Sequence, residues 1–306
     1  MTIHFWLPLA LLLTMFSNDV YGQACCNVIG STEFGVVGRC QEAVIATQVQ
    51  HTQVNGSFDH NGQYHSLGRS QIQDAIFTIG GGARVLDSRL QVIGSIPFRL
   101  QHRDFGQKQH NQSFGIGDVG LALRYTLIKD NMRGWAYGKA PFLDVILSSR
   151  LPTGRAPDQG ASEALGADVM GEGMLGFGSG LRLTSFFMPE HAIFFSGLYE
   201  IRLNTRPSER PNNDTLLGSV GYYYLIGQKW SFSSAIQYIF DDIFKSSLSS
   251  NTMTQLRMGL GVNYALSIPI WELSGMIVVD PWWMTVTHNV PFAGVSSMIS
   301  LKRNFL

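Results

Sequence analysis

Charged side chains recur on the polar face of long stretches in which polar and apolar residues alternate. This spacing could bring opposite charges together. Arginine supplies most of the bases, with 16 arginines against 6 lysines. A guanidinium group pairs bidentately with a carboxylate and keeps its charge when it is partly buried. One set of these charges falls near one end of the stretches and a second set near the other end. The first set is Arg99, Arg150, Arg202, Arg257, Asp74, Asp118, Glu200 and Asp241, and the second is Arg84, Arg124, Arg182, Asp144 and Glu272.

Two interpretations of these charges stay open. They could form a salt-bridged filling that closes the interior, or they could line a water-filled passage whose rings of opposed charge select solutes by size and sign. Because bases and acids nearly balance, the second interpretation predicts weak ion selectivity. Glycines on the same face, such as Gly176 and Gly178, leave space for water or for a plug from residues 23–42 or 152–171.

Other chemical motifs are weak. The glycine run at residues 80–82 is not followed by a predicted helix, so it does not have the form of a phosphate-binding loop. Histidines between residues 51 and 110 show no metal-ligand spacing, and we expect no metal and no cofactor. The sequence offers no credible set of nucleophile, base and orienting group, so we predict that the chain is not an enzyme.

Strict alternation of apolar and polar residues indicates the elements that must position the charges. Leu90, Val92 and Leu100 are apolar, whereas the interleaved Gln91 and Arg99 are polar, and this period of two is typical of strands with unlike faces. We predict twelve strands on this basis, at residues 43–54, 70–86, 89–102, 116–128, 140–151, 172–186, 191–204, 216–226, 229–241, 253–266, 270–281 and 292–305.

The connections between these strands alternate between long and short. The long ones are residues 55–69, 103–115, 152–171, 205–215, 242–252 and 282–291, and the others centre on residues 86–88, 129–139, 188–190, 227–228 and 268–269. Outer-membrane barrels have short periplasmic turns, long outer loops and an even number of strands. The pattern therefore predicts an all-β fold, a transmembrane antiparallel up-and-down β-barrel of about 12 strands at residues 43–306.

The faces of the predicted strands favour lipid over water on one side. One face of each strand is almost free of charge, as expected because Arg or Lys at a bilayer midplane costs ~2–4 kcal/mol. Aromatic residues such as Trp230 and Trp271 begin strands near the predicted short turns, where aromatic girdles lie in membrane proteins. Outer-membrane lipid is therefore the expected partner of this face.

The first 42 residues have a different character. Residues 5–16 are apolar but too short to span a bilayer, and residues 20–22 resemble a cleavage site, so residues 1–22 are predicted to be a cleaved signal peptide for export. Residues 23–42 then form a periplasmic segment. A disulfide from Cys25 or Cys26 to Cys40 fits an oxidising compartment and leaves one cysteine over, with lipidation of Cys25 as an alternative.

Composition excludes two further classes of protein. The chain carries 22 basic and 22 acidic residues, and without an excess of positive charge we expect no binding to nucleic acid. Apolar residues make up 45% of the 306 residues, which is too many for a disordered chain.

The motif GIGDVGL at residues 115–121, with Arg124 and Tyr125, and the motif LPTG at residues 151–154 carry a resemblance. The chain resembles Gram-negative outer-membrane β-barrel proteins, and its motifs are similar to those of the transporter-like family linked with aromatic-degradation (MetA-pathway) operons. This resemblance implies passage of small, often hydrophobic or aromatic, molecules through the bacterial outer membrane, without fixing the permeant. The last strand suits recognition by the barrel assembly machinery.

Two alternatives to transport stay open. A surface or structural envelope barrel, such as an adhesin, would share every feature named so far. An enzyme of the outer-membrane phospholipase type, also a twelve-stranded barrel, would need a His-x-Ser pair, and the sequence contains none.

Overall fold

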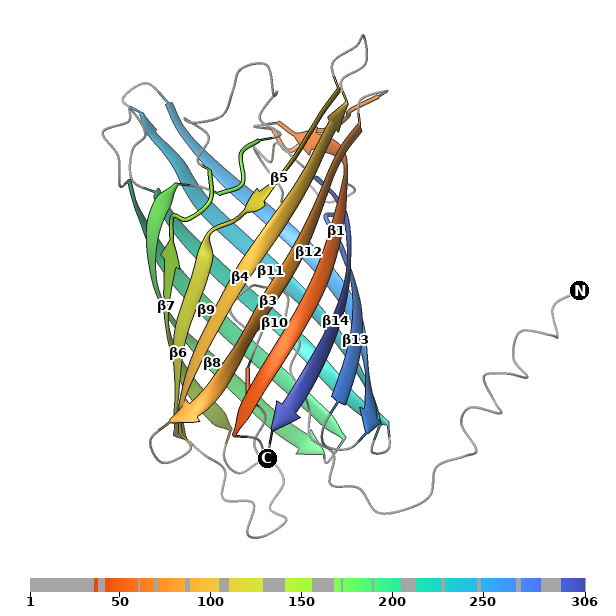
Figure 1. The fold of residues 1–306 in the computed structure, drawn as a ribbon. Coiled ribbons are helices and arrows are strands. Elements are labelled where there is room, and N and C mark those ends of the chain that lie inside the picture. The colour runs from red at the N-terminus through yellow and green to blue at the C-terminus, as the bar shows by residue number, and fades with distance from the viewer. Residues whose placement is uncertain are drawn as a thin grey trace, which may run out of the picture.

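The structure is a computed structural model in which every described element is a β-strand (Figure 1). The strands are β1 (Ala43–Phe58), β2 (Tyr64–Ser66), β3 (Gln71–Val85), β4 (Leu90–Asp104), β5 (His110–Ile116), β6 (Val119–Ile128), β7 (Phe142–Leu151), β8 (Met174–Met188), β9 (His191–Asn204), β10 (Asn213–Ile226), β11 (Trp230–Ser246), β12 (Ser249–Ser267), β13 (Trp271–Val279) and β14 (Ala293–Phe305). The structure describes residues 36–37, 42–59, 61–68, 71–85, 89–104, 110–128, 141–155, 168–171, 173–188, 190–204, 213–226, 229–246, 249–267, 271–281 and 293–305.

The strands pair antiparallel in chain order and close on themselves. Each barrel strand pairs with the next along the chain, and β14 returns to pair with β1, from Ala43 opposite Phe305 to Gly56 opposite Ala293. The short strand β2 pairs with β1 alone, outside the barrel wall. Because β5 and β6 together occupy one place in the wall, the barrel has twelve strands, and the predicted fold is confirmed.

The two ends of the barrel differ in their connections. At the end where β1 begins and β14 ends, four hairpins leave only a few residues between strands, and we call this the turn end. The opposite end, which we call the loop end, carries connections such as residues 152–173 and 280–292. The prediction of a long loop at residues 242–252 was wrong, because β11 and β12 continue pairing through a bulge until two residues separate them.

The prediction of one continuous strand at residues 116–128 was also wrong in its bounds. These residues are the part nearer the turn end of a longer strand, which is broken between β5 and β6. β6 pairs with residues 90–95 of β4, and β5 pairs with residues 98–104 of the same strand. Pro97 lies opposite the break and accepts a hydrogen bond from the Gly117 N–H (2.7 Å). In an antiparallel ladder the N–H and the carbonyl of one residue point to the same neighbouring strand. Proline has no N–H, so it cannot donate the second hydrogen bond to that strand. The missing donor therefore coincides with the interruption.

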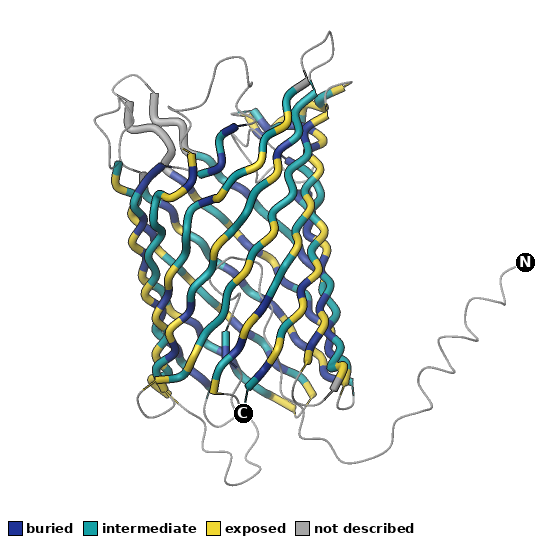
Figure 2. Tube along the Cα trace, in the orientation of Figure 1, coloured by how far each residue is buried: buried dark blue, intermediate teal, exposed yellow. Residues whose placement is uncertain are grey.

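Burial alternates along the strands, as Figure 2 shows over the whole wall. Many outward-facing residues of the strands are large and apolar, and they are exposed in the isolated chain; examples are Ile45, Leu121, Leu260 and Ile299. Their neighbours in sequence point into the lumen and are buried or half-buried. Among the residues that the structure describes, no helix is long and apolar enough to cross a membrane.

Candidate functional site in the barrel lumen

The first lumen ion pair lies between β3 and β4 near the loop end. Arg99 donates from its Nε to both carboxylate oxygens of Asp74 (2.9 and 2.8 Å) and also from Nη2. These residues are diagonal neighbours, because Ile76 is opposite Arg99 in the register and Asp74 is opposite Gln101. Asp118, which belongs to the same predicted set, lies at the break between β5 and β6, where its Oδ1 accepts the Gly154 N–H (3.0 Å).

A longer chain of charges runs across β7, β9 and β11. Arg202 donates from Nε to Glu200 (2.9 Å) and lies 3.3 Å from Asp241 through Nη1, while Arg150 lies 3.4 Å from Glu200. Asp241 also accepts a hydrogen bond from the Thr215 hydroxyl (3.0 Å). Two arginines thus share one buried glutamate, and the sequence-predicted residues of these strands form one network.

Gly176 makes part of this network possible. It lies on β8 between Arg150 of β7 and Arg202 of β9 in the register. A Cβ atom at this position would be 3.1 Å from the Arg150 Cβ and 3.1 Å from the Glu200 Oε1. The absence of a side chain therefore lets Arg150 reach Glu200 across an intervening strand, and the space is filled by protein rather than left for water.

Arg257, the last predicted arginine of this set, pairs with Asp280, the residue directly after β13. Its Nε lies 3.3 Å from the Oδ1 of Asp280, which also accepts hydrogen bonds from the Gln255 amide (2.8 Å) and from the Gly294 N–H (3.0 Å). The Asp280 carboxylate is therefore satisfied by three groups, of which Arg257 is one.

The second predicted set lies nearer the turn end. Arg124 and Thr126 of β6 both donate to the Asp144 carboxylate of β7, which is buried. Arg84 is half-buried on β3. Glu272 is buried on β13, directly opposite Lys302 of β14 in the register.

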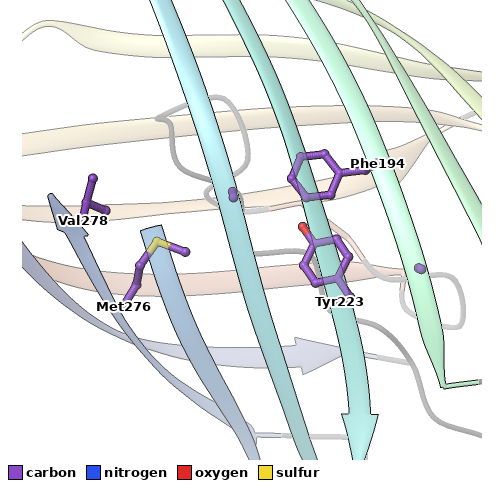
Figure 3. Packing of buried hydrophobic residues seen from close by; sticks show 6 residues of the cluster. Phe194, Tyr223, Met276 and Val278 are labelled. Atoms are coloured by element: carbon purple, nitrogen blue, oxygen red, sulfur yellow. The ribbon is translucent and has the colours of Figure 1, made fainter. Parts of the chain in front are cut away.

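Arg182 has an apolar setting. Its guanidinium lies 4.7 Å from the centre of the Phe194 ring, an arrangement that favours a cation–π interaction, and it donates to the Tyr223 hydroxyl (3.3 Å). Phe194 and Tyr223 stack with 5.1 Å between their centres and belong to a cluster with Met276 and Val278 of β13 (Figure 3). This cluster is an apolar core inside the barrel.

The N-terminal segment also enters the turn half of the lumen. The Lys302 ammonium of β14 donates to the Val36 carbonyl (2.9 Å), and the Val37 N–H donates to the side chain of Gln91 on β4 (3.2 Å). Val37 is 2% exposed, and the inward-facing Val44 and Ala46 near the start of β1 are also buried. Residues 36 and 37 thus bridge two strands that β1 and β3 separate, and they form part of a packed floor.

The two sequence motifs meet at the break in the wall. The Thr153 hydroxyl donates to the Gly117 carbonyl (2.7 Å) and accepts the Val119 N–H (3.0 Å). Gly154 approaches Gly171 so closely that a Cβ atom would lie 2.8 Å from the Gly171 backbone. The motifs therefore fasten the segment after β7 to the junction of β5 and β6, where β5 pairs with β4 alone.

The pKa of one acidic group outside the barrel wall, Asp59, is lowered. A hydrogen bond from His65, followed by those from the Gln63 and Asn61 backbones, lowers the pKa of Asp59 to about 2. Asp59 thereby holds together the hairpin of β1 and β2 at the loop end.

No group of three or more His, Cys, Asp or Glu side chains in the described stretches could hold a metal ion. Cys25, Cys26, Cys40 and the signal peptide prediction lie outside the described residues.

One contributor to the lumen, a pair of aromatic side chains, was missed from the sequence. Phe194 and Tyr223 are inward-facing aromatics, and the signal that could have found Phe194 is Gly221, opposite it in the register, since a large and a small residue often pack face to face. A plug from residues 23–42 was one of the predicted possibilities, but the sequence does not single out Val36 and Val37, because nothing in a short irregular segment specifies where it packs.

Comparison with solved structures places this fold among known barrels. No family model and no curated protein matches the sequence. The COG4313 outer membrane channel from Pseudomonas putida F1 superposes with a TM-score of 0.66 and 11% identity, over 91% of this chain and all of that one. The translocator domain of the autotransporter NalP from Neisseria meningitidis has a TM-score of 0.49 with 12% identity, over 87% of this chain and 89% of that one. This chain thus has the fold of an outer-membrane β-barrel.

Proposed function

We propose that this protein is an outer-membrane channel that passes small molecules, including hydrophobic or aromatic ones, through its charged lumen. Signal peptide 1–22 directs its export, the turn end faces the periplasm, and the last strand is recognised by the barrel assembly machinery. No catalytic role is part of this proposal.

The outward wall supports the membrane location. Leu260 and Ile299, each more than 60% exposed in the isolated chain, belong to an apolar belt that surrounds the barrel. Apolar surface costs roughly 25 cal/mol per Å² in water, and soluble monomers rarely expose a continuous patch of this kind. A lipid environment removes this cost.

The observation that carries transport is the lining of the loop half of the lumen. The arginines Arg99, Arg150 and Arg257 of the loop half remain partly accessible, whereas Phe194 and Tyr223 of the turn half are almost completely buried. An accessible, charged lining is what a passage for solutes requires.

The packed turn half favours a second candidate, a sealed envelope barrel with no transport role. Phe194, Tyr223 and Val37 are almost completely buried there, as an obstructed lumen would require. Planar-bilayer recording of the purified protein distinguishes the candidates: a channel gives discrete conductance steps. If neither the wild type nor a variant freed of its N-terminal segment conducts, the channel proposal is wrong.

Removal of residues 23–37 is expected to raise single-channel conductance, because Val36 and Val37 would no longer obstruct the floor. Gln91→Ala should act in the same direction, since it removes the acceptor for the Val37 N–H. Asn263→Ala is a matched control, because Asn263 is also a buried lumen amide but donates to Ser231 instead. Equal conductance in all four proteins would contradict a plugging role for the segment.

Topology can be tested in intact cells. An epitope inserted at Asn61, in the loop-end hairpin, is expected to bind antibody from outside, and one at Glu190, in the β8–β9 turn, is expected to stay hidden until the outer membrane is permeabilised. The reverse result would invert the proposed orientation.

A further inference from the structure

We propose that the loop half of the lumen is a binding zone for small carboxylates, held by Arg99, Arg150 and Arg257. This inference rests on the proposed channel and names its substrate class. It starts from an asymmetry within the ion pairs rather than from their net charge.

In each of these pairs the arginine is accessible and its acid is not. The side-chain exposure is 32% for Arg99 against 15% for Asp74, 28% for Arg150 against 10% for Glu200, and 37% for Arg257 against 9% for Asp280. Equal numbers of bases and acids would suggest weak selectivity, but a solute meets the groups that reach the lumen. Those groups are guanidinium ions, with the carboxylates behind them.

Two of these arginines also have donors to spare. Arg99 uses Nε and Nη2 on Asp74, and Arg257 uses only Nε on Asp280. Within the described part of the chain, Nη1 of Arg99 and both terminal nitrogens of Arg257 have no protein partner. A guanidinium edge with free N–H groups binds a carboxylate through two parallel hydrogen bonds.

The buried acids limit the charge of the ligand. Asp74, Glu200 and Asp280 lie within 4 Å of the arginines that would hold it, so an incoming anion is attracted by one charge and repelled by another slightly further away. A dianion doubles both the attraction and the repulsion, but its desolvation cost rises with the square of its charge, to about four times that of a monoanion. The site thus suits a carboxylate of single charge better than inorganic phosphate.

Arg257→Gln is the sharpest test, because it removes a lumen charge while its acid, Asp280, keeps two hydrogen bonds. These bonds come from Gln255 and from the Gly294 N–H. Arg303→Gln is the matched control: it makes the same change on β14 at an exposed, outward-facing position, where Arg303 lies 5.5 Å from the Trp271 ring centre.

Two measurements separate this inference from the channel proposal. Under a salt gradient in planar bilayers, the wild type is expected to prefer anions, Arg257→Gln to lower the anion-to-cation permeability ratio about threefold, and Arg303→Gln to leave it unchanged. Line broadening of ¹³C-acetate by the detergent-solubilised protein tests binding even if no current flows. We expect broadening by the wild type and Arg303→Gln and a loss of it in Arg257→Gln. The carboxylate site would be overturned by a current that prefers cations, by equal broadening in all three proteins or by absent broadening. It would also be overturned if phosphate competed more strongly than unlabelled acetate. Absent current alone contradicts only the channel.

Discussion

Leu260→Arg is expected to impair insertion of the barrel severely. Leu260 lies in the middle of β12, is 68% exposed and faces outward between Ser234 and Ile277 in the register. An arginine here would lie in the hydrocarbon layer, at a cost of ~2–4 kcal/mol. The measurement is refolding into lipid vesicles, followed by the shift in electrophoretic mobility between folded and heat-denatured protein, and Leu121→Arg should behave alike.

The control for this prediction is arginine on the inward face. Ala122 and Gly261 point inward, but they are unsuitable, because Ala122 is buried and a Cβ atom at Gly261 would lie 2.6 Å from the Ser233 hydroxyl. Thr78 faces an accessible part of the lumen, so Thr78→Arg should fold in high yield. If Thr78→Arg and Leu260→Arg fold equally well, the assignment of inward and outward faces is wrong.

Gly221→Val is expected to lower stability by about 1–3 kcal/mol or more, the usual cost of overpacking a filled interior. A Cβ atom at Gly221 would lie 2.2 Å from the Phe194 ring and 2.7 Å from the Ser234 carbonyl oxygen. Phe194 cannot move aside easily, because Tyr223 stacks on its ring and Arg182 lies over it. The midpoint of urea unfolding in detergent, followed by tryptophan fluorescence, measures the effect.

Gly218→Val is its matched control on the same strand. A Cβ atom at Gly218 meets nothing within 4 Å, and the position faces outward. Valine suits a strand better than glycine, so this variant should be at least as stable as the wild type. Equal destabilisation by the two substitutions would show that strand flexibility, rather than packing against Phe194, governs the effect.

The fold could be predicted because polar and apolar residues alternate along a strand with two unlike faces. A helix has a period of about 3.6 residues and does not give this alternation. The outward Leu121 and Leu260 and the inward Arg99 and Arg150 all lie on the faces that alternation assigns to them. Strand ends were harder to place: the polar residues 249–252 give no apolar alternation, yet β12 begins at Ser249, because backbone pairing with β11 extends the ladder there.

The lumen contents could be predicted only in part. Residue types placed arginines and acids on the inward face, and the near-balance of charge predicted weak ion selectivity for an open passage. The glycines of that face were expected to leave room, but Gly176, Gly221 and Gly261 are spaces that Arg150, Phe194 and Ser233 occupy from neighbouring strands. Whether a missing side chain leaves a void depends on what lies beside it across the sheet.

Alternation within single strands was sufficient to predict a barrel with an apolar outside and a charged inside. The pairing of the charges could be learned only from the folded barrel: Arg150 reaches Glu200 across β8, Val36 and Val37 close part of the floor, and Arg99, Arg150 and Arg257 are more accessible than their acids. These outcomes depend on register, on the reach of long side chains and on relative depth. Such quantities arise between strands far apart in the sequence, and no local pattern encodes them.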